Sequence, residues 1–298
     1  ELGMNLPGEI DRMAEIASPS MGVITNIGPA HLQFLYSLKG VLEAKAELIP
    51  HIRPEGKLIL NADDPWMLEL SQRARCPVLT FGLNPEAHFH AFNIKSLGAK
   101  GFNFHLKTPS DQIEMSLPVI GRHNIMNALT AIAVANSLEL DLAQIKECLC
   151  SFRPVKGRLE LIELPNGLTL LNDSYNANPK SMAHALETLA EIKEQRRTIA
   201  VLGDMLELGE ISQDAHLKTG ELVAKICVDY LVTVGELAQG IAEGALKVGF
   251  ASSQLYRCSD RDEASRVLLK IAKSADLVLL KASRKIGLDR LIDSLKEI

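Results

Sequence analysis

The segment 172–182, Asn-Asp-Ser-Tyr-Asn-Ala-Asn-Pro-Lys-Ser-Met, places polar side chains between two apolar stretches. Its carboxylate, Asp173, can accept a hydrogen bond from a ligand hydroxyl such as that of a ribose. The segment also predicts a helix start, and free backbone N–H groups at a helix start favour an anion. These residue types in this order indicate a ligand site of an α/β protein. The alternative is an ordinary turn rich in Asn and Ser.

The elements around this segment must hold it in place. Residues 168–171 form an apolar run typical of a buried strand, and apolar residues recur at helical spacing over 182–192. Asn178 is predicted as the N-cap of that helix and Pro179 as its first residue. The predicted order is therefore strand, polar loop and capped helix.

The first half of the chain shows two patterns. Between residues 22 and 82, strand-like runs (23–27, 58–60 and 78–81) alternate with helical stretches (38–49 and 65–74), which is typical of α/β proteins. Between 88 and 120 the residues alternate between apolar and polar around Gly98 and Gly101, which predicts an antiparallel meander. Helices are predicted again at 124–138 and 142–150.

A domain boundary is predicted after residue 156, giving domains 1–156 and 157–298. The second domain reads as a Rossmann-like α/β unit, because its apolar runs are spaced for helices between mostly parallel strands. These strands are predicted near 160–164, 168–172, 198–202, 230–234 and 276–280.

Composition excludes several classes of protein. The 298 residues carry a formal charge of −5 with dispersed Lys and Arg, which gives no general attraction to nucleic acid or to an anionic membrane. There is no apolar run of about 18 residues and no basic leader, so neither a membrane span nor a signal peptide is predicted. Five scattered cysteines without zinc-like spacing indicate reduced thiols and a cytoplasmic protein: Cys76, Cys148, Cys150, Cys227 and Cys258.

The segment 172–182 resembles the D-S-Y-N-A-N-P-x-S-M signature of the Mur ligases that add D-alanyl-D-alanine to the cell-wall precursor, the MurF-type enzymes. Seven further blocks resemble the family in the family's order, and they span the whole chain. They lie at 25–32, 44–47, 61–64, 121–128, 157–158, 203–209 and 281–284.

The resemblance implies an ADP-forming amide ligase of peptidoglycan precursor synthesis. Such an enzyme uses ATP and Mg²⁺ to activate the carboxylate of UDP-N-acetylmuramoyl-tripeptide as an acyl phosphate, which the amino group of D-alanyl-D-alanine then attacks. It also implies a monomer. The implied α/β fold is a partial central ATPase-type domain with the antiparallel meander, followed by the Rossmann-like C-terminal domain.

The resemblance assigns a magnesium site to Glu1, His31 and Lys45, with His31 and Lys45 also catalytic. Lys45 matches the lysine that the family carbamylates, and the modification turns an ammonium that would repel the metal into a carboxylate-like ligand. Taken singly, the three residues also fit a solvated terminal carboxylate, a loop histidine and a charged helix face.

The nucleotide is implied to contact both domains. Asn124 and Asn127 lie three residues apart at a helix start, where they match adenine-binding residues or serve as helix caps. Asp173 matches a ribose ligand. Arg158 matches a catalytic arginine that reaches the nucleotide phosphates, a task that its planar guanidinium suits.

Charge complementarity suggests where the dipeptide binds. Acidic residues after the strand 198–202 would receive an ammonium, and basic and hydroxyl residues after the last predicted strand would receive a carboxylate; the alternative is two solvated loops. The expected substrate-binding residues are Asn176, Asn178, Asp204, Glu207, Lys281, Ser283 and Arg284.

The chain also departs from the family pattern. It contains no G-x-x-x-x-G-K-[ST] phosphate loop, and the resemblance places Glu1 partway through the central domain. We therefore expect a fragment that is weak or inactive alone, with an incomplete sheet exposing a pairing edge.

The sequence leaves one main alternative to this ligase and disfavours two other functions. A non-catalytic nucleotide- or peptide-binding module is the main alternative. A dehydrogenase is disfavoured because no G-x-G-x-x-G follows a predicted strand. The related ligase that adds the third peptide residue is disfavoured because its signature after the aspartate differs.

Overall fold

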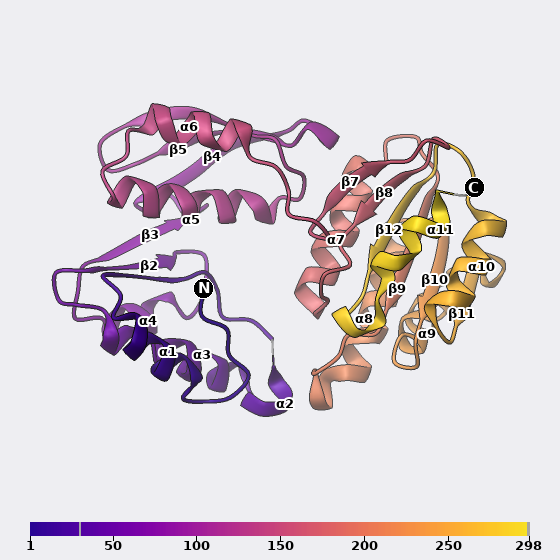
Figure 1. The fold of residues 1–298 in the computed structure, drawn as a ribbon, viewed down its shortest axis with the longest axis horizontal. Helices are drawn as coiled ribbons and strands as arrows, with labels where there is room; N and C mark the ends of the chain where they lie inside the picture. Colours follow the sequence, from indigo (N-terminus) through magenta and orange to yellow (C-terminus); the bar gives the residue numbers. More distant parts are fainter. Residues whose placement is uncertain (30, 297–298) are drawn as a thin grey trace. The chain divides into compact units, whose positions relative to one another are not determined.

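The computed structural model describes residues 1–29 and 31–296. The chain forms two compact units, Glu1–Arg153 and Pro154–Ile298, whereas the sequence placed the division after residue 156. Each unit is built on one six-stranded sheet with helices on both faces (Figure 1). The predicted α/β class is confirmed in both units.

The first unit contains one mixed sheet in the order β1-β2-β3-β4-β5-β6. Strands β1 to β4 run parallel to one another, and β4, β5 and β6 form the predicted antiparallel meander. Strand β1 pairs with β2 alone and so lies at one edge of this sheet. The strands are β1 (Met21–Ile24), β2 (Lys57–Asn61), β3 (Val78–Gly82), β4 (Phe89–Ser96), β5 (Phe102–Lys107) and β6 (Gln112–Leu117).

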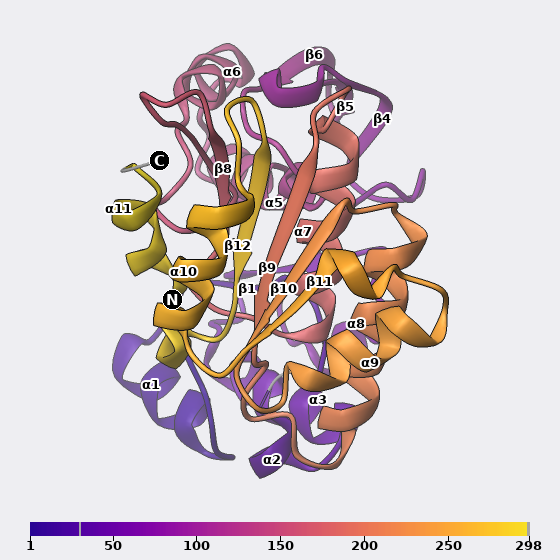
Figure 2. The same ribbon diagram turned by 90° about the vertical axis from the view of Figure 1, so that its right-hand side faces the viewer.

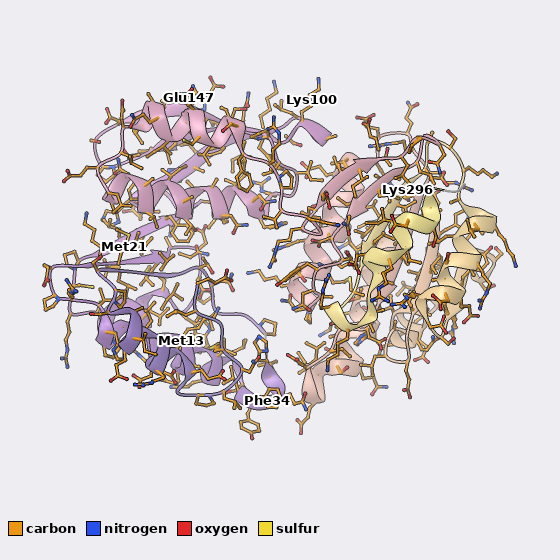
Figure 3. The ribbon with its side chains drawn as sticks, in the orientation of Figure 1. Met13, Met21, Phe34, Lys100, Glu147 and Lys296 are labelled. Atoms are coloured by element: carbon orange, nitrogen blue, oxygen red, sulfur yellow. The ribbon has the colours of Figure 1, made fainter. Side chains whose placement is uncertain are left out.

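The helices of the first unit are α1 (Glu9–Ala17), α2 (Leu32–Leu35), α3 (Leu38–Ala46), α4 (Met67–Arg73), α5 (His123–Ser137) and α6 (Leu142–Ser151). Side chains of β2 point alternately to the two faces of the sheet and so belong to two hydrophobic cores. Leu58 and Leu60 pack with α1, α3 and α4, whereas Ile59 packs with α5 and α6. All three side chains are fully buried, which explains why β2 reads as a continuous apolar run. Figure 3 shows charged side chains such as Lys100 and Glu147 on the outer surface.

The second unit contains a sheet in the order β11-β10-β9-β12-β8-β7, whose strands lie side by side in Figure 2. All neighbours are parallel except β7, which is antiparallel to β8. Strand β11 was not predicted, because this four-residue edge strand carries the exposed Arg257. The strands are β7 (Glu160–Glu163), β8 (Thr169–Asn172), β9 (Thr198–Gly203), β10 (Tyr230–Val234), β11 (Leu255–Cys258) and β12 (Leu277–Lys281).

Five α-helices pack on this sheet: α7 (Pro179–Ile192), α8 (Ser212–Lys225), α9 (Gln239–Lys247), α10 (Arg261–Ile271) and α11 (Leu291–Leu295). The predicted start of α7 is confirmed. The Asn178 side chain accepts from the Ser181 backbone N–H at 2.8 Å, the Ser181 hydroxyl accepts from the Asn178 N–H, and Pro179 is the first helical residue.

The order of strands brings three loops together. Because β12 lies between β8 and β9 and runs parallel to both, the carboxyl ends of these three strands lie at the same edge of the sheet. The loops 173–178, 204–208 and 282–283 follow these ends. Open α/β sheets bind ligands at this edge.

Short 3₁₀ helices occur in several connections: η1 (Ile49–His51), η2 (Gly98–Lys100), η3 (Gly209–Ile211), η4 (Ser252–Gln254), η5 (Arg284–Ile286) and η6 (Leu288–Arg290). Within residues 1–29 and 31–296, no helix combines the length and apolar character that crossing a bilayer requires.

Candidate functional site

A cavity of about 670 Å³ in the first unit brings three predicted residues to one place. Glu1, His31 and Lys45 all border it, although they come from the start of the chain, the loop before α2 and the last turn of α3. Apolar side chains such as Met21 and Ile24 form much of its wall. One carboxylate, one imidazole and one amine therefore border a single hollow.

Lys45 is held against the loop that follows β1. Its half-buried ammonium donates a hydrogen bond to the Asn26 carbonyl oxygen at 2.7 Å. The same loop is tied down on both sides, because the Asn61 amide donates to the Thr25 carbonyl at 3.0 Å and the Ile27 N–H donates to the Asp64 carboxylate at 2.7 Å. The position of the Lys45 nitrogen is thus fixed by a rigid partner.

The fit of a magnesium ion depends on the chemical state of Lys45. Among the described residues, no three or more His, Cys, Asp and Glu side chains are grouped so that they could hold a metal. Magnesium prefers oxygen ligands, and an ammonium repels it. Carbamylation would add an oxygen ligand beside Glu1 and His31. The carbamate nitrogen keeps one hydrogen, so the hydrogen bond to the Asn26 carbonyl would persist. The residues therefore fit the ion in the carbamylated form.

His31 occupies an unusual backbone position. Its φ of 53° is left-handed, and its carbonyl oxygen accepts from the Leu35 N–H at 3.0 Å, which starts helix α2. The preceding residue, Ala30, lies outside the described residues. The short helix α2 thus fixes the backbone position from which the His31 side chain extends.

Asn124 and Asn127 form a linked pair in the first turn and a half of α5. The Asn124 amide donates back to the Ile120 carbonyl at 2.7 Å, and its oxygen accepts from the Asn127 amide at 2.9 Å. Asn124 is therefore used in holding the helix start. Asn127 is exposed, and it keeps a carbonyl oxygen and a second N–H, the donor and acceptor pair that an adenine edge needs.

Asp173 and Lys281 form a buried ion pair in the second unit. The Lys281 ammonium donates to the Asp173 carboxylate and, at 3.1 Å, to the Asn176 carbonyl, and its side chain is only 2% exposed. Burial raises the pKa of Asp173 and lowers the pKa of Lys281, while the attraction between the two charges opposes both shifts. The pair joins the ends of β8 and β12.

This pairing gives Lys281 an internal role that the sequence did not predict, and its contact with a ligand stays a prediction. We expected its ammonium to face a ligand carboxylate, but burial and two internal acceptors occupy it. Asn178 is likewise engaged through its oxygen as the α7 cap. Asn176 is exposed, with its side-chain oxygen accepting from the Ala177 N–H at 2.9 Å.

The loops after β9 and β12 are also joined internally. The Ser283 hydroxyl accepts from the Leu206 N–H at 2.9 Å, and the Asp204 carboxylate accepts from the Ala238 N–H at 2.7 Å. Burial raises the pKa of Asp204. Asp204 and Ser283 therefore hold the loops through these bonds, and their direct contact with a ligand stays a prediction. Glu207 in the same segment is exposed.

Arg158 and Arg284 are two exposed cations of this edge. Arg158 lies between the boundary and β7, and Arg284 begins the turn after β12. Both are close to the Tyr175 ring, at 4.2 and 5.9 Å from its centroid. The loop ends of the second unit therefore present positive charge beside an aromatic side chain.

His216 fixes the loop after β9 from inside the unit. Its side chain is buried, with one ring nitrogen bonded to the Ser212 carbonyl at 2.7 Å and the other accepting from the Met205 N–H at 3.0 Å. This arrangement requires the neutral imidazole with hydrogen on Nδ1. Burial accordingly lowers the pKa of His216.

We expect the second unit to lose stability as the pH falls through about 6.5, because the unfolded imidazole takes up a proton there while the folded one resists it. His216→Gln supplies an uncharged acceptor for the Met205 N–H and should flatten this part of the stability curve. Burial also lowers the pKa of His184. Its effect on the pH dependence of stability is the same in the unmodified protein and in His216→Gln. Urea unfolding between pH 5 and 8 measures the effect, and parallel pH profiles would contradict it.

Comparison with known proteins places these two units in one family. Residues 1–135 match the Mur ligase middle domain, and residues 157–284 match the Mur ligase, glutamate ligase domain. The chain belongs to the Mur ligase family. Both sets of site residues described above lie within the matched Mur ligase domains, with Glu1 as the first residue of one match and Arg284 as the last residue of the other.

Individual Mur ligases agree with this assignment. The chain is 33% identical over 297 residues to the UDP-N-acetylmuramoyl-tripeptide--D-alanyl-D-alanine ligase of Bacillus subtilis (strain 168) and 35% identical over 301 residues to that of Escherichia coli (strain K12). All of this chain is covered in both cases, and it spans 64% of the length of each relative.

Solved Mur ligases share the fold. A crystal structure of MurF from Acinetobacter baumannii matches all of the chain with a TM-score of 0.89 at 31% identity, over 64% of its own length. MurF ligase from Thermotoga maritima, solved in complex with ADP, matches with a TM-score of 0.85 at 24% identity, over 66% of its length. At that identity the second match supports the fold alone.

Sequence reasoning missed several residues of this Mur ligase that hold the site together. Asn61 and Asp64 lie in a block that resembled the family, but their bonds to the loop 25–27 had no local signal. His216 lies 11 residues from its partner Met205 and resembles any helical histidine in sequence. Tyr175 lies inside the signature, yet only the structure shows the guanidinium on its ring.

Proposed function

We propose that this chain is part of a MurF-type ligase, an ATP-dependent, ADP-forming enzyme that joins D-alanyl-D-alanine to UDP-N-acetylmuramoyl-tripeptide in peptidoglycan precursor synthesis. The names of the relatives support this reaction, and so does one observation above all others. Glu1, His31 and Lys45, far apart in sequence, border one cavity. A module that only bound a peptide would have no use for a metal set.

The first unit would hold the activating ion. Glu1, His31 and carbamylated Lys45 are its proposed ligands, and the Asn26 carbonyl orients the Lys45 nitrogen. Mg²⁺ bound there would screen the repulsion between ATP and the substrate carboxylate during phosphoryl transfer. The apolar wall of the cavity limits water, which strengthens the electrostatic contacts inside it.

Four residues are proposed to bind the nucleotide. Asn127, supported by Asn124, would read the adenine edge through its free donor and acceptor. Asp173 would accept from a ribose hydroxyl, since each carboxylate oxygen can accept more than one hydrogen bond. Arg158 would contact the phosphates through its planar guanidinium.

For the dipeptide, we propose the exposed groups at the loop ends of the second unit. Arg284 would receive the carboxylate, and Glu207 would receive the ammonium before it is deprotonated for attack. Asn176 presents its side chain beside the same loop. Lys281, Asp204, Ser283 and Asn178 are proposed to hold these loops in place, as their internal bonds suggest.

The reaction type gives a direct test. With ATP, Mg²⁺, UDP-N-acetylmuramoyl-tripeptide and D-alanyl-D-alanine, the full-length protein that contains this chain should form ADP and phosphate in equal amounts with the ligated pentapeptide. Omitting D-alanyl-D-alanine should suppress turnover, which is the matched control. Release of AMP would reject activation through an acyl phosphate. Tight ATP binding without turnover would favour the alternative, a non-catalytic binding module.

We further propose that the protein acts in the cytoplasm as a monomer. All five cysteines are free thiols, including the exposed Cys148, Cys150 and Cys227. Exposed free thiols suit a reducing compartment.

A further inference from the structure

Tyr175 is an exposed aromatic residue with two cations beside it. It follows Asp173 and Ser174 in the loop after β8, and 47% of the residue is exposed. The guanidinium carbon of Arg158 lies 4.2 Å from its ring centroid, and that of Arg284 lies 5.9 Å away. The shorter distance is that of a guanidinium stacked on the ring face.

The backbone on both sides of this contact is fixed. Arg158 lies between Gly157, with φ 74°, and Leu159, with φ 48°, so two left-handed residues turn the chain around it. The Leu159 N–H donates to the Asp173 carboxylate at 3.1 Å, and the Tyr175 N–H donates to the Gly157 carbonyl at 3.1 Å. Left-handed φ is costly for leucine, and the surrounding bonds maintain it.

The Arg158 guanidinium has few other restraints. In the described part of the chain it contacts the Tyr175 ring and forms no hydrogen bond or ion pair with an acid, although the Asp173 carboxylate is near enough to attract its charge. Arg284 differs, because one of its nitrogens lies 3.4 Å from the Asp289 carboxylate. Stacking uses the face of a guanidinium and leaves its N–H groups, which lie in the plane, for an anion.

We propose that Tyr175 is a positioning residue that holds the guanidinium of Arg158 with its N–H groups directed to the nucleotide phosphates. This inference rests on the proposed function, in which Arg158 contacts ATP. An arginine side chain otherwise loses considerable rotamer freedom on binding, and the ring removes part of that freedom beforehand. The hydroxyl of Tyr175 plays no part in this role, whereas the ring is essential.

The test compares Tyr175→Phe, which keeps the ring, with Tyr175→Leu, which removes it. Proton and nitrogen resonances of the arginine side chains, assigned through Arg158→Lys, report the stack directly. The Arg158 Nε–H proton should be shifted upfield by the ring in the unmodified protein and in Tyr175→Phe, and it should return to the ordinary position in Tyr175→Leu. An unshifted proton in the unmodified protein overturns the proposal.

ATP affinity of the full-length protein, measured calorimetrically with Mg²⁺, tests the consequence. Exposed cation–π contacts correspond to about a two- to fivefold weaker affinity in Tyr175→Leu and to unchanged affinity in Tyr175→Phe. In an Arg158→Ala background, Tyr175→Leu should have no further effect. Equal affinities of the unmodified protein and Tyr175→Leu, or full additivity with Arg158→Ala, overturn the inference. Failure of the proposed function would differ, because the unmodified protein would then bind no ATP.

Discussion

Replacing Asp173 by Asn should lower the free energy of unfolding of the second unit by about 3–5 kcal/mol, the usual cost of removing one partner from a buried ion pair. The reason is the position of Lys281, whose side chain is 2% exposed. Without the carboxylate, the ammonium must either stay charged in a site of low polarity or lose its proton. Of the two bonds that join Lys281 to the loop 173–178, only the one to the Asn176 carbonyl would remain intact.

Urea unfolding followed by far-UV circular dichroism measures this loss. Trp66, the single tryptophan, lies at the start of α4, so its fluorescence reports on the first unit and identifies the transition that should not move. The matched control is Asp214→Asn, which breaks the exposed ion pair with Lys218 and should change little.

A second variant separates charge from packing. In Asp173→Asn with Lys281→Met, both charges are replaced, so much of the lost stability should return. Equal, small losses for Asp173→Asn and Asp214→Asn would show that the buried pair does not hold the second unit together. No recovery in the double variant would assign the loss to packing.

In the full-length protein, Lys45→Ala should reduce ligase turnover by about 100-fold or more, because it removes the group proposed to complete the magnesium ligands. Bicarbonate or a short-chain carboxylic acid should restore part of the activity by placing a carboxylate in the vacated space. Labelled bicarbonate should also give a carbamate carbon resonance in the unmodified protein that Lys45→Ala lacks. This second readout does not depend on turnover.

Lys39→Ala is the control for this experiment, since Lys39 lies on the same helix α3 but is exposed and away from the cavity. It should retain full activity. If Lys45→Ala turned over substrate at the normal rate, carbamylation would have to be removed from the proposed chemistry. Loss of activity without rescue would leave a structural role for the bond to Asn26 as the cause.

The sequence determined the features that depend on near neighbours. The Asn178 cap and the start of α7 follow from bonds between residues three apart, which the local order of residue types encodes. Buried strands such as β2 and β12 have continuous apolar runs, 58–60 and 277–280, because both faces of a sheet flanked by helices are covered. The signature 172–182 identified the family for the same reason, since its residue types stand in one short segment.

The tertiary structure decided which of the charged and polar groups face a ligand. Lys281 and Asp173 are 108 residues apart, and the residues next to each of them do not indicate that the two side chains form a buried pair. Edge strand β11 was not predicted, because a strand of four residues with an exposed position shows little hydrophobic periodicity in its sequence. The partners, the burial and the pKa shifts of Asp173 and Lys281 depend on the position of β12 between β8 and β9. This long-range strand pairing is fixed by the packing of the whole unit.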